Sequence, residues 1–150
     1  MQIILYQPQI PQNTGNVVRT CSVTGSSLGL VTPLGFSLHD RWLKRAGLDY
    51  WGGVDVQIVE DLESFLEKTA ANFYFFSSKA TAYYTDLRFE KSDILIFGSE
   101  TTGLDPKFFA RWPEKFARIP MVSEARCLNL ATSAGIVLFE AWRQNNFDFK

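Results

Sequence analysis

The sequence has little histidine, little cysteine and no long apolar run. His39 is its one histidine, and Cys21 and Cys127 are its two cysteines, so the sequence predicts neither a zinc site nor a disulfide framework. No apolar run approaches the roughly 20 residues that a membrane-spanning helix needs. Met1 leads into a strand pattern without a basic segment and a cleavage site. We therefore expect a cytoplasmic protein without a metal ion or a membrane partner.

A strong charge of one sign is also missing. The formal net charge is -1 and the pI is near 5.8, which argues against nonspecific coating of nucleic acid, although a local basic patch can still grip a folded RNA. The chain has 150 residues, of which 46% are hydrophobic and 21% charged. These values predict one globular domain that spans residues 1–150 and buries a core of its own.

Strand and helix patterns alternate along the chain. The β-type runs lie at residues 3–6, 28–31, 54–59, 73–76, 94–97 and 116–119. Between them the sequence predicts a helix that starts at residues 13–16 and stops at Gly25, a short basic helix after Ser37, a helix from Asp61 to about Thr69, and a helix at residues 106–111. This alternation predicts an α/β fold with a parallel sheet that helices cover on both faces.

A closing helix follows the last predicted strand. Apolar residues recur at helical spacing from Leu128 onward, and Asn129 and Thr132 are candidate capping residues. Residues 133–135 are small, and residues 136–139 are apolar nearly all round. We expect such a helix to be buried, or half buried against a partner.

Ligands of parallel sheets bind at the carboxyl ends of the strands. The stretches there are residues 8–19, 77–84, 98–103 and 120–127. A dinucleotide fold would place GxGxxG after the first strand, where this chain has PQIPQNTGN, and GSETTG at residues 98–103 lacks the lysine of a P-loop. Glu100 would repel a phosphate and suits a ligand with cationic character or a partner arginine. The alternative is a glycine-rich surface turn.

Three blocks in order carry a resemblance to a known family. They are PQNTGNVVRTC at residues 11–21, IFGSETTGL at 96–104 and IPMVSEARCLNLATSAGIVLFEAWRQ at 119–144. They resemble the motifs of the SPOUT RNA methyltransferases, and with LGFSLHDRWLKRAGLDYW at 34–51 the chain looks most like small tRNA 2′-O-methyltransferases of the TrmL type. The resemblance implies a C-terminal deep trefoil knot, which is a rare exception to unknotted topology.

The resemblance also implies partners, a cofactor and a substrate. Members of the family are homodimers with shared active sites, and they bind S-adenosylmethionine in the knot. They methylate the ribose of the tRNA wobble nucleotide, cytidine or uridine 34, and leucine tRNAs are the expected substrates. The residues that the resemblance assigns to the cofactor are Phe76, Gly98, Glu100, Gly103, Ile119, Met121, Cys127 and Leu128. Main-chain N–H and C=O groups can form hydrogen bonds with the edge of an adenine, while apolar side chains pack against its faces. The alternative role for Phe76, Ile119 and Met121 is ordinary packing in the protein core.

The resemblance assigns catalysis to Arg19. A ribose hydroxyl is a poor nucleophile until its proton is drawn away, and a guanidinium that stays charged best serves to orient a phosphate and stabilise the developing oxyanion. Pairing with Glu100 is the alternative role. His39 as a base and Cys127 as a nucleophile are less favoured. Asn13 and Asn16 are predicted to support the substrate site, and Arg126 and Asn129 to contact RNA or to organise the knot. Arg41, Lys44 and Arg45 are predicted to form a basic RNA-binding patch, and the alternative for them is a solvated helix face.

The sequence departs from the family at several positions. Relatives commonly have Ser at Cys127, Ser-Asn at Ala131-Thr132 and Tyr at Phe139. These changes leave open a competing hypothesis, an RNA-binding or assembly module that keeps the fold without catalysis. An unrelated α/β nucleotide-binding enzyme is a third, weaker alternative, because it requires three ordered motifs to be coincidental.

Overall fold

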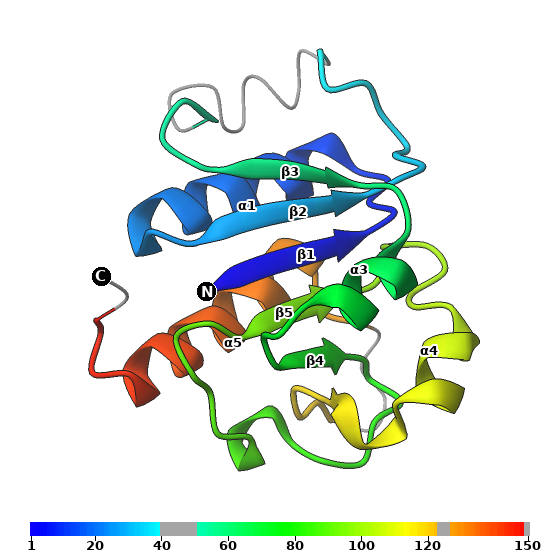
Figure 1. The fold of residues 1–150 in the computed structure, drawn as a ribbon, viewed down its shortest axis with the longest axis vertical. Coiled ribbons are helices and arrows are strands. Elements are labelled where there is room, and N and C mark those ends of the chain that lie inside the picture. Colours follow the sequence, from blue (N-terminus) through cyan, green and yellow to red (C-terminus); the bar gives the residue numbers. More distant parts are fainter. Residues whose placement is uncertain (40–50, 123–126, 149–150) are drawn as a thin grey trace.

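A computed structural model describes residues 1–39, 51–122 and 127–148. In this part of the chain six strands form one sheet with the order β3-β2-β1-β5-β4-β6 (Figure 1). All neighbouring strands pair in parallel. The strands are β1 Gln2–Tyr6, β2 Ser27–Val31, β3 Val56–Val59, β4 Phe73–Phe76, β5 Ile94–Phe97 and β6 Phe116–Ala117.

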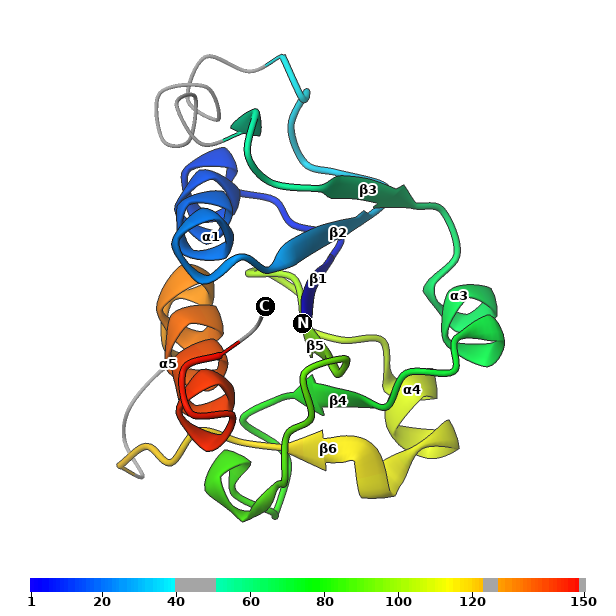
Figure 2. The same cartoon turned by 60° about the vertical axis from the view of Figure 1, so that its left-hand side comes forward.

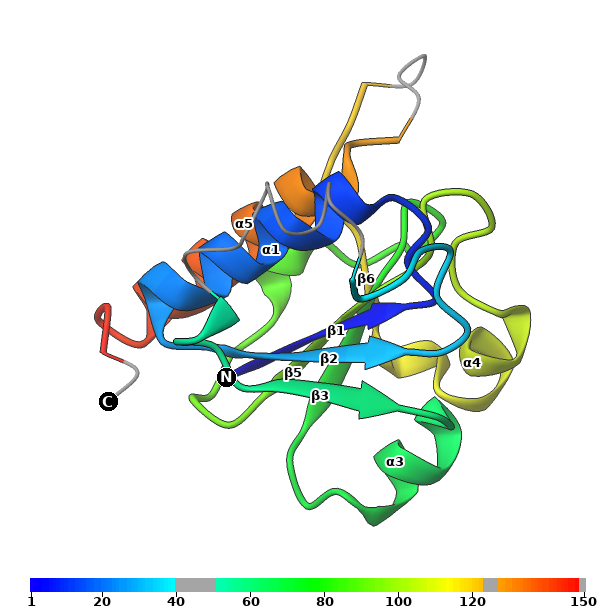
Figure 3. The same cartoon turned by 90° about the horizontal axis from the view of Figure 1, so that it is seen from above.

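Helices cover both faces of the sheet, as expected for a parallel sheet. One face carries α1 (Pro11–Thr24) and α5 (Leu130–Gln144), which lie side by side, and the other carries α3 (Leu62–Lys68) and α4 (Pro106–Arg111) (Figures 2 and 3). Each face buries its own apolar cluster: Val17, Leu130 and Leu138 belong to the α1 and α5 side, whereas Phe75 and Phe108 belong to the α3 and α4 side. The predicted α/β class and the parallel sheet with two covered faces are thus confirmed.

Most helix ends agree with the sequence signals. Gly25 ends α1 in the left-handed region, with φ of 69°, as a C-terminal glycine should. The side chain of Asp61 caps α3, and the Asn129 side chain caps α5 by accepting from the backbone N–H groups of Ala131 and Thr132. Thr132 itself lies inside α5, so its predicted capping role is wrong.

The predicted start of the first helix is also wrong. The α1 helix begins at Pro11, not at residues 13–16, with Ile10 as its N-cap. Proline fits the first helical position because its missing N–H would lack an intrahelical partner there and its φ is already helical. Pro11, which precedes the predicted start, is therefore the first residue of the helix.

The last strand is shorter than predicted, and its continuation has neighbours on two sides. β6 ends at Ala117, and Arg118 extends it by a single parallel bridge to Tyr83. Ala117 O accepts from Ser77 N at 3.0 Å, Arg118 N donates to Ala82 O at 2.9 Å, and Tyr84 N donates to Arg118 O at 2.9 Å. Residues 116–118 therefore lie between β4 on one side and residues 82–84 on the other.

None of the helices in the described ranges is both long and apolar enough to cross a membrane.

Candidate active site

A cavity of about 680 Å3 opens at the carboxyl ends of the central strands. This is the edge at which ligands of parallel sheets bind. All four stretches that the sequence places at this edge contribute to the wall. The cavity is lined by Ile10, Asn13, Phe76, Ser77, Ser78, Lys79, Phe97, Gly98, Ser99, Glu100, Thr101, Thr102, Gly103, Leu104, Ile119, Met121, Cys127, Leu128, Asn129, Leu130 and Ser133.

The loop after β5 forms one wall through an unusually close backbone approach. Ser99 N donates to Gly103 O at 3.1 Å, and Gly103 N donates to Ser99 O at 2.9 Å, so the loop closes on itself. A Cβ atom on Gly98 would lie 2.5 Å from the Gly103 carbonyl carbon. Gly103 has φ of 69°, a region that glycine enters without steric cost. The two glycines are therefore required by the shape of the loop.

The Glu100 carboxylate joins this loop to the start of α1. Its Oε2 accepts from Gln9 N at 2.8 Å, and its Oε1 accepts from Ile10 N at 3.2 Å and from Asn13 Nδ2 at 3.1 Å. Ile10 offers no side-chain cap to α1, and a carboxylate near a helix N-terminus is stabilised by the helix dipole. N–H donors of the chain itself thus hold both oxygens, and the expectation that Glu100 suits a cationic ligand or a partner arginine stays a prediction.

A chain of hydrogen bonds continues from Glu100 to α5. Asn129 Nδ2 donates to Asn13 Oδ1 at 2.8 Å, and Asn129 Oδ1 accepts from Ala131 N at 2.9 Å and Thr132 N at 3.2 Å. Asn13 is 6% exposed, so its bond with Asn129 is partly shielded from water, whereas the two bonds that Asn129 Oδ1 accepts are exposed. The two asparagines thereby join the three sequence blocks. Their predicted part in RNA binding stays a prediction.

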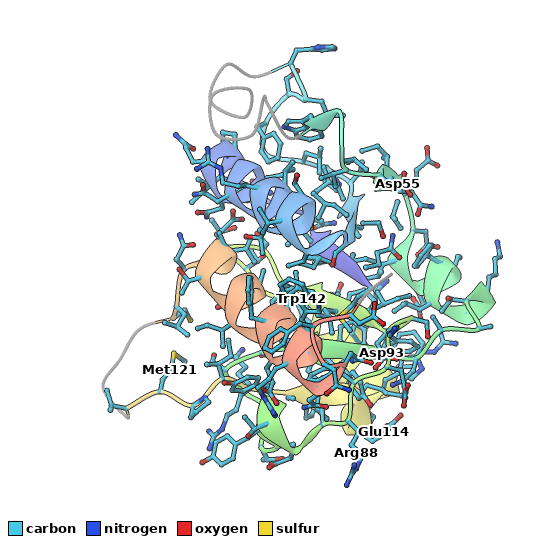
Figure 4. All side chains as sticks on the ribbon, turned by 90° about the vertical axis from the view of Figure 1, so that its left-hand side faces the viewer. Asp55, Arg88, Asp93, Glu114, Met121 and Trp142 are labelled. Carbon is cyan, nitrogen blue, oxygen red and sulfur yellow. The ribbon has the colours of Figure 1, made fainter. Side chains whose placement is uncertain are left out.

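The floor of the cavity is apolar. The Phe76 and Phe97 rings stack at a centroid distance of 5.0 Å and an interplanar angle of 20°, and both residues are buried. Ile119, Leu128 and Leu130 add further apolar wall. In Figure 4 Met121 lies on the segment that leaves β6, far from Asp93 at the amino end of β5. A flat aromatic ligand such as a nucleobase suits this floor, with loop backbone groups around it.

Charge is sparse around the cavity. Among the described lining residues the charged side chains are Glu100 and Lys79, and the N–H donors named above surround the Glu100 charge.

Burial raises the pKa of the Cys21 thiol to about 12, so that thiol stays protonated at neutral pH, whereas Cys127 is exposed and lines the cavity. Both thiols are free. Within the described ranges, no three His, Cys, Asp or Glu side chains are grouped to hold a metal ion.

The structure brings together the eight residues predicted to bind the cofactor, because each of them lines the cavity. Their binding role remains a prediction. Asn13 and Asn129 lie with them, whereas Arg19 and Asn16 are exposed on α1 and are not part of the lining. Arg41, Lys44, Arg45 and Arg126 fall outside the described residues. His39 is exposed.

The sequence reasoning missed several hydroxyl-bearing or charged lining residues. They are Ser77, Ser78, Lys79, Thr101, Thr102 and Ser133. The available signal was position alone, since residues 77–79 directly follow β4 and Ser133 lies in the first turn of α5.

Comparisons with known proteins agree with this geometry. Residues 1–139 match the SpoU rRNA Methylase family. A tRNA (cytidine(34)-2′-O)-methyltransferase of Methylovorus glucosotrophus (strain SIP3-4) is 45% identical over 147 residues, which cover 97% of this chain and 96% of the relative.

Solved structures are similar as well. One that concerns the 2-OH methylation of C/U34 on tRNA superposes with a TM-score of 0.91 at 42% identity and covers 98% of this chain and 97% of that chain. An AdoMet-bound rRNA methyltransferase from Sinorhizobium meliloti has a TM-score of 0.84 at 25% identity and covers 95% of this chain and 55% of that chain.

Proposed function

Because this chain belongs to the SpoU rRNA methylase family, we propose that it transfers a methyl group from S-adenosylmethionine to the ribose 2′-hydroxyl of nucleotide 34 of a tRNA. The observation that carries the proposal is the cavity, which three separate sequence blocks build at the carboxyl edge of the sheet. Relatives of nearly equal length are named as enzymes of this activity, so catalysis is better supported than a non-catalytic RNA-binding module. Cytidine or uridine 34, and leucine tRNAs, are the proposed substrates.

The cavity fits the cofactor in size and in chemistry. Its volume of about 680 Å3 is within the range of small-molecule sites, and the stacked floor with the bent loop at residues 98–103 suits an adenosine. When bound, S-adenosylmethionine supplies a methyl group activated by a sulfonium. Phe76, Ile119 and Leu128 would pack the adenosine, and the backbone of the loop at residues 98–103 would pair with its polar edge.

The protein's own contribution to the chemistry is to hold the ribose and to stabilise charge. The 2′-hydroxyl develops negative charge as its proton leaves, and we assign Arg19 to orient the neighbouring phosphate and to stabilise that oxygen. Arg19 is exposed and outside the lining of the cavity of its own chain. A second chain that brings its α1 to the cavity would resolve this separation.

We therefore also propose a homodimer that uses α1 and α5. These helices pack on each other over one face of the sheet (Figure 2), yet they leave Val23 58% and Phe139 45% exposed. A stable interface buries at least about 1,000 Å2 in total. Light scattering at micromolar concentration should give twice the 17.1 kDa of one chain, and a monomer would contradict the proposal.

The deep trefoil knot is part of the proposal. Its support is the position of residues 116–118, which have β4 on one side and residues 82–84 on the other, so the connection from β4 to residue 82 passes around this strand.

The proposed activity is tested with radiolabelled S-adenosylmethionine and full-length leucine tRNA. We expect methyl transfer to tRNA with cytidine or uridine at position 34, and none when nucleotide 34 carries a 2′-deoxyribose, because the acceptor oxygen is then absent. Binding of the same tRNA without any transfer would favour the non-catalytic module, and transfer to the deoxy substrate would place the methyl group elsewhere.

A further inference from the structure

Among the described residues, one side of the cavity mouth carries no carboxylate of its own, although the chain as a whole has 16 Asp and Glu residues and a net charge of -1. This side, which we call the rim, consists of residues 77–85 and 118–122. Its sequences are SSKATAYYT and RIPMV, with two cations, two tyrosines and no acid. Ser77, Ser78, Lys79, Ile119 and Met121 of the rim line the cavity.

Backbone hydrogen bonds fix the two parts of the rim to each other. Arg118 N donates to Ala82 O and Arg118 O accepts from Tyr84 N, each at 2.9 Å, so Tyr83 and Arg118 lie opposite each other in a parallel bridge. The Arg118 guanidinium carbon lies 5.0 Å from the centre of the Tyr83 ring, and Arg118 Nη2 donates to Tyr83 Oη at 3.4 Å. The Arg118 guanidinium therefore helps to hold the Tyr83 ring in place. Tyr83 remains 41% exposed, so its ring is still available to a ligand.

Lys79 supplies a positive charge at the cavity wall itself. Ala80 N donates to Ser77 O at 3.1 Å and Lys79 N to Ser77 Oγ at 3.3 Å, while buried Ala80 anchors the turn. The Lys79 side chain is exposed and forms no ion pair with any described acid. The nearest acid in sequence, Asp86, directs Oδ2 to the backbone N–H of Tyr83 at 3.1 Å.

This combination matches single-stranded RNA. Unstacked bases pack on aromatic rings and guanidinium planes, and phosphates pair with lysine. Because the whole chain is slightly acidic, its attraction for RNA has to come from local patches without carboxylates.

We propose that the rim binds the RNA strand next to the methylated nucleotide, with a base stacked on Tyr83 and a phosphate on Lys79. This assignment rests on the proposed function and adds two residues that position the substrate. Lys79 and Tyr83 are not among the residues assigned to pack the adenosine, although Lys79 and Ile119 of the rim also line the cavity.

The Lys79 contact is tested with Lys79→Gln in the full-length protein. The matched control is Lys68→Gln, because Lys68 is also an exposed lysine and lies on α3. Lys79→Gln should weaken tRNA binding and reduce the salt slope of log Kd by about one unit, because one phosphate contact is lost. Lys79→Arg should restore most of the affinity. Lys68→Gln should leave both quantities unchanged.

The Tyr83 contact is tested with Tyr83→Leu and its conservative counterpart Tyr83→Phe. Loss of one base stack should raise the KM for tRNA about 5- to 100-fold with little change in kcat, whereas Tyr83→Phe keeps the ring and should stay near wild type. Thermal denaturation monitors folding of every variant, and calorimetry with S-adenosylhomocysteine monitors the cofactor pocket.

The possible outcomes separate this inference from the proposed function. If the wild-type protein transfers no methyl group to tRNA, the proposed function fails before the variants are compared. If the wild type is active and the folded variants keep its salt slope and KM, the rim assignment is overturned while the function stands. A Lys79→Gln variant that loses S-adenosylhomocysteine affinity but keeps its tRNA salt slope would assign Lys79 to the cofactor, which also overturns the proposal.

Discussion

Replacement of Arg19 by alanine is expected to slow methyl transfer about 100- to 1,000-fold, or roughly 3 to 4 kcal/mol of transition-state stabilisation. Cofactor affinity should stay nearly intact. The reason is that Arg19 lies outside the cavity lining, and that N–H donors of Gln9, Ile10 and Asn13 already hold the Glu100 carboxylate of the cofactor loop. The measurement combines calorimetric cofactor affinity and single-turnover methylation on one preparation, after the variant is shown to be dimeric.

A purely structural role of Arg19 predicts a different result. If Arg19 only anchored Glu100, its removal would loosen residues 98–103 and lower cofactor affinity and rate in parallel. Arg88→Ala is a matched control, because Arg88 is an exposed arginine that lies at the opposite end of the molecule from α1 in the view of Figure 4. Near-wild-type turnover of Arg19→Ala would remove Arg19 from the catalytic assignment.

The Gly98→Ala variant is expected to lose cofactor binding by at least about tenfold. The added methyl group would lie 2.5 Å from Gly103 C and 2.7 Å from Leu104 N. These are backbone atoms that cannot rotate away, and overpacking of this kind costs about 1 to 3 kcal/mol. The pairing between Ser99 and Gly103 would open, and the wall that faces the adenosine would move.

Gly52→Ala provides the control for this prediction, since a Cβ atom at Gly52 meets no atom of the described residues within 4 Å. That variant should bind S-adenosylhomocysteine like the wild type in a calorimetric titration. Unchanged affinity of Gly98→Ala would mean that the loop at residues 98–103 tolerates a shift, and that this loop does not shape the cofactor site.

The fold was predictable from the sequence where the signals are local. Apolar runs of four residues define β4 and β5, and Asp61, Gly25 and Asn129 mark helix ends through their own backbone or side chains. Pro11 was a local signal for the start of α1, because proline fits the first helical position, but we expected the start later. What no local window contains is the contact with Glu100, which accepts from Ile10 N and is 90 residues away in sequence.

The candidate site was predictable in its membership but not in its contacts. The family resemblance named all eight predicted cofactor residues, and the structure places each of them around the cavity. A family pattern indicates which sequence positions come together at a shared site. It did not supply the partners of Glu100, which depend on the exact approach of the loop to α1. Lys79 and Tyr83 lie in the stretch at residues 77–84 that was expected at the ligand edge, but they were not singled out, because a lysine or a tyrosine in a loop carries no periodic signal.

The hydrogen bonds that run from Glu100 through Asn13 to Asn129 also set an order of events during protein synthesis. Asn13 is made early, and its carboxamide oxygen meets Asn129 only after most of the chain has left the ribosome. Cys127, Leu128 and Ser133, which complete the cavity, are added just as late. A nascent chain can therefore form most of its sheet while it still lacks a ligand site, and the site comes into existence only when the last helix has docked.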